Sequence, residues 1–128
     1  GAQAVATDVC VPISRLAECV VETEKDLETV GLLSPIVGHV GDGNFHCSML
    51  VDVNDPDEMQ RADGFLHRLV ERAQAMGGTC TGEHGIGQGK QKYLETELGP
   101  EAVQAMRALK AALDPNNILN PGKILPPA

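Results

Sequence analysis

A tight turn, Gly41-Asp42-Gly43-Asn44, separates two apolar segments near the middle of the chain, at residues 32–40 and 45–53. Asp-Gly between two such segments is a strong signal for an antiparallel β-hairpin. Pro35 lies in the first segment, so we expect that strand to start irregularly. The remaining elements must therefore pack against a central pair of strands.

Segments with helical periodicity flank this hairpin. Before it, apolar residues at helical spacing run from residue 13 to residue 27, and Gly31 is a natural C-cap. After it, Asp55-Pro56 begins a second helix with an acidic first turn, and Gly77-Gly78 ends that helix. Short apolar segments at residues 9–11 and 79–81 are expected to add two strands.

The order of elements is therefore strand, helix, strand, strand, helix, strand. Two more helices are expected at residues 91–98 and 100–113, followed by an extended tail. This order predicts an α+β fold, a ferredoxin-like split βαβ sandwich with helices on one face of an antiparallel sheet. We expect residues 1–128 to form a single domain. The chain begins without Met in an apolar segment, which suggests a C-terminal fragment of a longer protein.

Composition argues against two classes of function, nucleic-acid binding and membrane spanning. The net charge is -8 and Trp is absent, so the chain lacks both the cations and the stacking side chains that nucleic-acid binding uses. No apolar run reaches membrane-spanning length, and no signal peptide is visible. The four cysteines form no C-x-x-C pair, so we expect reduced, mostly buried thiols in an intracellular protein.

The hairpin turn also relates two histidines. If Asp42 and Gly43 are the two loop residues, His39 lies directly opposite His46, with Cβ atoms roughly 4.5–5.5 Å apart on one face. Two imidazoles placed in this way can share one divalent ion. The alternative is that both are ordinary polar residues on a sheet surface, and the mirrored spacing favours the metal site.

A second motif, at residues 82–87, reads Gly-Glu-His-Gly-Ile-Gly. Glu83 would complete a two-histidine, one-carboxylate site, which keeps open positions for water or substrate. His84 would lie beside the metal and act as a general base. The alternatives are a plain glycine-rich turn and a phosphate-binding loop before Lys90, although the spacing fits neither common phosphate motif.

These two motifs and the segment at residues 113–123 resemble the C-terminal domain of FAD-linked oxidases of the vanillyl-alcohol-oxidase type. That group includes D-lactate dehydrogenases with a cytochrome acceptor, glycolate oxidase flavin subunits and D-2-hydroxyglutarate dehydrogenases. Residues 7–12 and 79–85 look most similar to the D-lactate branch. The glycolate oxidase flavin subunit and other 2-hydroxy-acid dehydrogenases are the alternatives.

The resemblance implies specific roles for single residues. The positions matching His39, His46 and Glu83 hold a zinc- or manganese-like ion, and the one matching His84 is the proposed base. Asn44 and Asn120 lie in the matching motifs and are expected to be cofactor-binding residues, and the resemblance implies that the segment around Asn120 runs back toward a flavin domain.

The resemblance also implies partners. FAD is expected to be bound mainly by an N-terminal domain of the same protein that this chain does not include. The expected substrate is a small 2-hydroxy acid, D-lactate first, and the electron acceptor a cytochrome or quinone. The expected location is the cytoplasm or the periphery of the inner membrane in a bacterium, and the mitochondrion in a eukaryote. The isolated chain is expected to fold without dehydrogenase activity.

Two other functions fit the same residues. One is a non-enzymatic, ferredoxin-like module that senses a metal or a small ligand. The other is a metal-dependent hydrolase, since a two-histidine, one-carboxylate site can also activate water.

Overall fold

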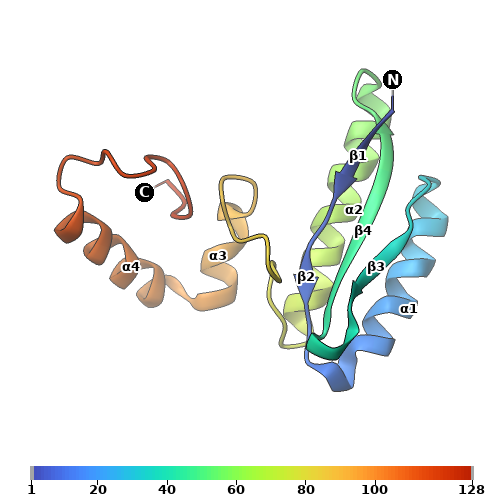
Figure 1. The fold of residues 1–128 in the computed structure, drawn as a ribbon, viewed down its shortest axis with the longest axis horizontal. Coiled ribbons are helices and arrows are strands. Elements are labelled where there is room, and N and C mark those ends of the chain that lie inside the picture. Colours follow the sequence, from blue (N-terminus) through green and yellow to red (C-terminus); the bar gives the residue numbers. More distant parts are fainter. Residues whose placement is uncertain (1, 128) are drawn as a thin grey trace. The chain divides into compact units, whose positions relative to one another are not determined.

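The computed structural model describes residues 2–127, which fall into two compact units, Gly1–Glu83 (unit 1) and His84–Ala128 (unit 2). Figure 1 labels the helices and strands of both units. Our expectation that the whole chain forms a single domain stays a prediction.

Unit 1 is built on one antiparallel sheet. Its elements are β1 (Ala2–Ala6), β2 (Val9–Cys10), α1 (Ile13–Val30), β3 (Ile36–His39), β4 (Asn44–Asp52) and α2 (Pro56–Ala75). β4 pairs with β1 and β2 along one edge and with β3 along the other. The segment expected as a strand at residues 79–81 pairs with β2 only through a single antiparallel bridge between Cys10 and Thr79. Because β4 separates the first strand from β3, the split βαβ, ferredoxin-like α+β fold is confirmed.

β1 and β2 are two parts of one interrupted strand. Ala6 lies opposite Ser48 and Val9 opposite Phe45, so the register against β4 is unchanged across the gap. The Thr7 N–H still donates to the Cys47 carbonyl at 2.9 Å. The continuous register therefore places Asp8 opposite His46, an arrangement on which the site depends.

The two faces of the sheet differ. The helices α1 and α2 cover one face of the sheet (Figure 1). Side chains of β4 point alternately to the two faces, and those on the helix side are buried: Phe45, Cys47, Met49 and Val51. The intervening residues, among them Asn44, His46 and Leu50, point to the other side. We call this side the open face, because none of the helices described in unit 1 covers it.

The irregular start expected for the hairpin's first strand is confirmed. β3 begins only at Ile36, yet the carbonyls of Leu33 and Pro35 accept from the N–H groups of Leu50 and Ser48. Pro35 has no N–H to donate, so it interrupts the ladder. The helix boundaries also follow the sequence: Gly31 ends α1 in a left-handed conformation, and the Asp55 carboxylate accepts from two N–H groups at the start of α2.

The four cysteines are free thiols, as expected. Cys19, Cys47 and Cys80 are buried, and burial raises the pKa of the Cys47 thiol to about 11. No helix among residues 2–127 is both long and apolar enough to cross a membrane.

Unit 2 contains the two predicted helices, α3 (Gln91–Leu98) and α4 (Pro100–Leu113), followed by an irregular tail. Asp114 ends α4 and holds the start of this tail. Its carboxylate accepts from the backbone N–H groups of Ile118 and Leu119 at 3.0 and 2.9 Å, and also from the Lys110 ammonium.

This cluster predicts a pH-dependent stability. The hydrogen bond from Lys110, supported by the two backbone N–H groups, lowers the pKa of Asp114 to about 2. An unfolded Asp titrates at about 3.9, so the stabilisation is present above pH ~4 and is lost as the pH falls toward 2. Asp114→Asn should therefore lower the melting temperature at pH 7 and have a shrinking effect at lower pH, measured by circular dichroism. Glu28→Gln, an exposed acid in α1, is the charge-matched control. An equal loss at pH 7 and pH 2 would contradict this account.

Candidate metal centre

The hairpin brings His39 and His46 to one face, but by a different register from the one expected. His39 lies opposite Asn44, and His46 lies opposite Val37. The expected two-residue loop is wrong: Val40–Asp42 forms a short 3-10 turn, and Gly43 completes a four-residue connection with φ 75°. The register moves by two residues, and an even shift preserves the face. The histidines are therefore diagonal neighbours, with ring centroids 6.4 Å apart.

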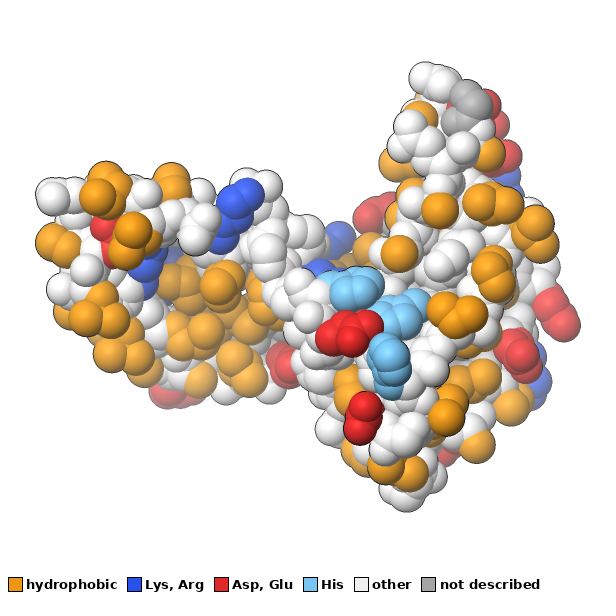
Figure 2. All heavy atoms as spheres, in the orientation of Figure 1, with side chains coloured by type: hydrophobic (Ala, Val, Ile, Leu, Met, Phe, Trp, Pro, Cys, Tyr) orange, Lys and Arg blue, Asp and Glu red, His pale blue; other side chains and the backbone are white. Residues whose placement is uncertain are grey.

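Glu83, the last residue of unit 1, contacts the same two imidazoles. Its Oε1 lies 3.1 Å from His46 Nε2 and 3.5 Å from His39 Nε2. The three possible ligand atoms all lie within 4.8 Å of one another. Figure 2 shows imidazole and carboxylate side chains gathered on this side of unit 1. Imidazole nitrogen and carboxylate oxygen are ligands that zinc, manganese and iron all accept.

The hydrogen bonds of His46 are compatible with a cation at this point. His46 Nδ1 lies 3.0 Å from the Thr7 carbonyl, which can only accept, so Nδ1 carries the hydrogen. In a neutral imidazole, Nε2 is then a bare acceptor, and it faces the Glu83 oxygen, a second acceptor, at 3.1 Å. Two acceptors at this distance need a proton or a metal cation between them. The donor set therefore fits a divalent cation.

Exposure differs among the three side chains. The His46 side chain is 12% exposed, whereas those of His39 and Glu83 are 61% and 51% exposed. The candidate centre therefore has one side chain set into the sheet and two exposed to solvent.

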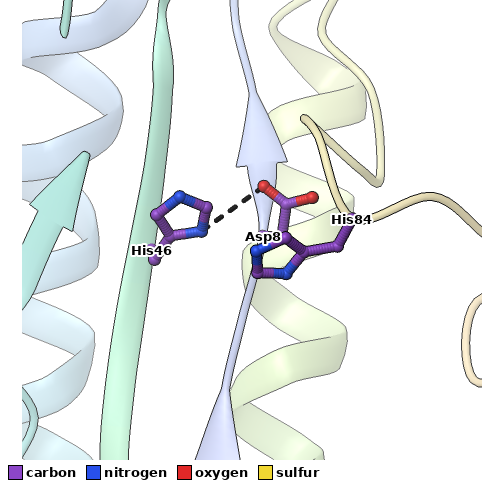
Figure 3. A group of neighbouring side chains, drawn as sticks. All are labelled: Asp8, His46 and His84. Atoms are coloured by element: carbon purple, nitrogen blue, oxygen red, sulfur yellow. Dashed lines mark ion pairs between the residues drawn. The ribbon is translucent and has the colours of Figure 1, made fainter. Parts of the chain in front are cut away.

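Asp8 is part of this centre, although it belongs to neither of the two motifs that select His39, His46 and Glu83. Its carboxylate is 1% exposed and lies 3.4 Å from His46 Nδ1. The dashed line in Figure 3 marks this ion pair. The carboxylate also accepts from Asn44 and from the backbone that leads into Glu83. The signal that would have identified it is register: Asp8 is the residue opposite His46 across the strand pair.

Gly82 permits the close approach of this backbone. A Cβ at position 82 would overlap the Asn44 side chain and lie 2.7 Å from the Asp8 carboxylate. Only glycine therefore fits between these two groups, and the close fit fixes the chain one residue before Glu83.

Asn44 lines a small pocket of about 150 Å³, together with Cys10, His39, Asp42, Gly82 and Glu83. Its Nδ2 donates to the Asp8 carboxylate and to the Val9 carbonyl, so the orientation of the amide is determined. Its Oδ1 is buried and has no hydrogen-bond partner in the described part of the chain. That oxygen can accept from a bound group, and the cofactor-binding role expected for Asn44 stays a prediction.

The other two predicted residues belong to unit 2. His84 is its first residue and follows Glu83 directly, so their Cα atoms are one peptide apart, about 3.8 Å. Asn120 is exposed in the tail, with φ 45°, and its carbonyl accepts from the Lys123 N–H. The roles of both residues stay predictions.

Residues 1–124 match the family described as FAD linked oxidases, C-terminal domain. The chain is also similar to a solved 4-ethylphenol oxidase from Gulosibacter chungangensis, with a TM-score of 0.70 and 20% identity over 97% of this chain and 24% of that one. At this identity the likeness supports the fold alone.

Three curated relatives are more similar in sequence. A probable mitochondrial D-lactate dehydrogenase of Danio rerio is 58% identical over 98% of this chain and 25% of that protein. A mitochondrial D-lactate dehydrogenase (cytochrome) of Arabidopsis thaliana is 50% identical over 99% and 22%. Glycolate oxidase subunit GlcD of Bacillus subtilis is 44% identical over 91% and 25%. The chain spans about a quarter of the length of these relatives.

Proposed function

The chain belongs to the family of FAD-linked oxidase C-terminal domains, and on that premise we propose that it is the substrate- and metal-binding domain of a longer flavin-dependent 2-hydroxy-acid dehydrogenase. The observation that carries the proposal is the group of His39, His46 and Glu83, in which two acceptor atoms face each other at 3.1 Å. The names of the relatives in Danio rerio and Arabidopsis thaliana support D-lactate as substrate and pyruvate as product. The Bacillus subtilis relative supports glycolate as the second candidate.

The three ligand residues would hold a zinc- or manganese-like cation. When bound there, the cation supplies Lewis acidity that makes a substrate hydroxyl easier to deprotonate. Glu83 and His39 are half exposed or more, so they leave the solvent side of the centre open to a small 2-hydroxy acid. His46 keeps its Nε2 lone pair available for the centre, because its Nδ1–H is held by the Thr7 carbonyl.

His84 is the proposed proton acceptor. Its place directly after Glu83 in the sequence supports this role, in which an imidazole beside the proposed cation acts as a general base. His84 takes the hydroxyl proton as the 2-hydroxy acid becomes a 2-oxo acid. FAD, bound mainly by another part of the longer protein, supplies the hydride-accepting chemistry. Asn120 would contribute to the cofactor side of the site from the tail.

The remaining partners follow from the same proposal. The reduced flavin requires an electron acceptor, for which we propose a cytochrome or a quinone. The relatives from Danio rerio and Arabidopsis thaliana are named as mitochondrial, and this supports a mitochondrial location if the source is a eukaryote. In a bacterium we propose the cytoplasm or the periphery of the inner membrane.

The experiment uses the full-length flavoprotein and a panel of D-2-hydroxy acids. We expect D-lactate to bleach the flavin absorbance, chelation to abolish this reduction, and Zn²⁺ or Mn²⁺ to restore it. The 128-residue chain by itself is the control: with no flavin domain it should give no turnover of D-lactate with a dye acceptor. Product formed without any electron acceptor would favour a hydrolase, and no turnover of any acid would favour a sensing module. Either result would overturn the proposal.

A further inference from the structure

Asp8 is one of five buried polar or charged side chains among the residues described, and it has an unusual number of donors. Its Oδ2 accepts from the Thr81 hydroxyl at 3.0 Å and from the backbone N–H groups of Gly82 and Glu83 at 2.7 and 3.0 Å. Its Oδ1 accepts from Asn44 Nδ2 at 2.8 Å and lies 3.4 Å from His46 Nδ1. One carboxylate thus connects three segments that are distant in sequence.

These contacts reach two of the three ligand residues of the proposed centre. Through Oδ1, Asp8 favours the His46 tautomer in which Nε2 carries no hydrogen and can bind a cation beside Glu83. Through Oδ2, it holds the peptide that immediately precedes the Glu83 side chain. His39, the third, has a side chain that is 61% exposed.

We propose that Asp8 is a positioning residue that sets the metal-binding geometry of His46 and Glu83 before the cation arrives. The inference rests on the proposed function, because the cation is part of it. A buried carboxylate is costly unless its hydrogen bonds are satisfied, and the donors named above belong to the centre or to the loop that enters it. Outer-shell partners of metal ligands typically change metal affinity by about 10–100-fold when they are replaced.

The test is cation titration of the metal-free full-length protein with Mn²⁺ and Co²⁺. Asp8→Asn keeps the size of the side chain but turns an amide N–H₂ toward groups that are themselves hydrogen-bond donors. We therefore expect Mn²⁺ to bind roughly 10–100-fold more weakly. The visible spectrum of bound Co²⁺ should also change, because the ligand geometry changes. Asp55→Asn is the matched control: it removes the same charge from a carboxylate that also accepts from two backbone N–H groups, at the start of α2. It should change neither the affinity nor the spectrum.

A second variant keeps the test decisive if Asp8→Asn does not fold. Thr81→Val removes one hydrogen bond to Oδ2 and should weaken Mn²⁺ binding roughly two- to tenfold, the equivalent of one hydrogen bond. Affinity and Co²⁺ spectrum equal to the wild type in the folded variants would overturn the role of Asp8 and leave the metal centre standing. A wild-type protein that binds no cation would overturn the metal centre itself, and the role of Asp8 with it.

Discussion

Replacing His46 with Gln is expected to remove cation binding from the full-length protein and, with it, turnover of the 2-hydroxy acid. His46 is the least exposed of the three ligand residues, at 12%, and its Nδ1 is held by the Thr7 carbonyl. Its Nε2 is therefore already placed when a cation arrives, and Gln cannot present a nitrogen lone pair there. The loss should exceed the roughly 10–100-fold typical of outer-shell partners, because a ligand itself is removed.

The measurement is metal content by elemental analysis after equilibrium dialysis, together with the rate of flavin reduction. The matched control is His67→Gln. His67 lies in α2, its side chain is 51% exposed, and it pairs with Glu71 at 3.4 Å, so this variant should keep both metal and activity. Full metal content in His46→Gln would show that the cation site is elsewhere.

The pairing of His39 and His46 shows which part of such a centre a sequence can predict. The Asp-Gly turn predicted a hairpin and two histidines on one face, and both expectations are confirmed. The predicted register was wrong by two residues, because Val40–Asp42 adopts a 3-10 turn instead of joining the strands. Side-chain direction depends only on whether a register shift is odd or even, so the face was predictable although the exact partner was not.

Asp8 could not be selected in the same way. A lone aspartate before a short apolar segment is most simply a turn or strand-end residue, and nothing nearby in the sequence marks it as buried. Its role depends on β1, β2 and β4 sharing one register and on Gly82 leaving space for the returning chain. Both are long-range properties, set by packing between residues more than thirty positions apart. The helices, by contrast, were predictable because caps such as Asp55 and Gly31 act within a few residues of themselves.

Replacing His84 with Ala in the full-length protein is expected to lower kcat by about 10²–10⁴-fold while the cation stays bound. The rate and the metal content should respond differently, because His84 is proposed to take the hydroxyl proton. The metal is proposed to be held by other residues: His39, His46 and Glu83. Removing an imidazole also leaves a space that free imidazole can enter, so adding it to the assay should restore part of the rate. His67→Ala, which removes an exposed imidazole from α2, should show neither the loss nor the rescue.

The outcome of His84→Ala also distinguishes the possible roles of this residue. Loss of metal together with activity would make His84 a ligand, and an unchanged kcat would remove it from the reaction. Loss of kcat with metal retained and rescue by imidazole is the result that a general base alone predicts. Glu83 and His84 are adjacent in sequence, and Asp8 accepts from the Glu83 N–H, so Asp8 holds the backbone one residue before the proposed base. An Asp8→Asn protein saturated with cation should therefore still turn over more slowly than the wild type, since saturating the metal does not restore that backbone.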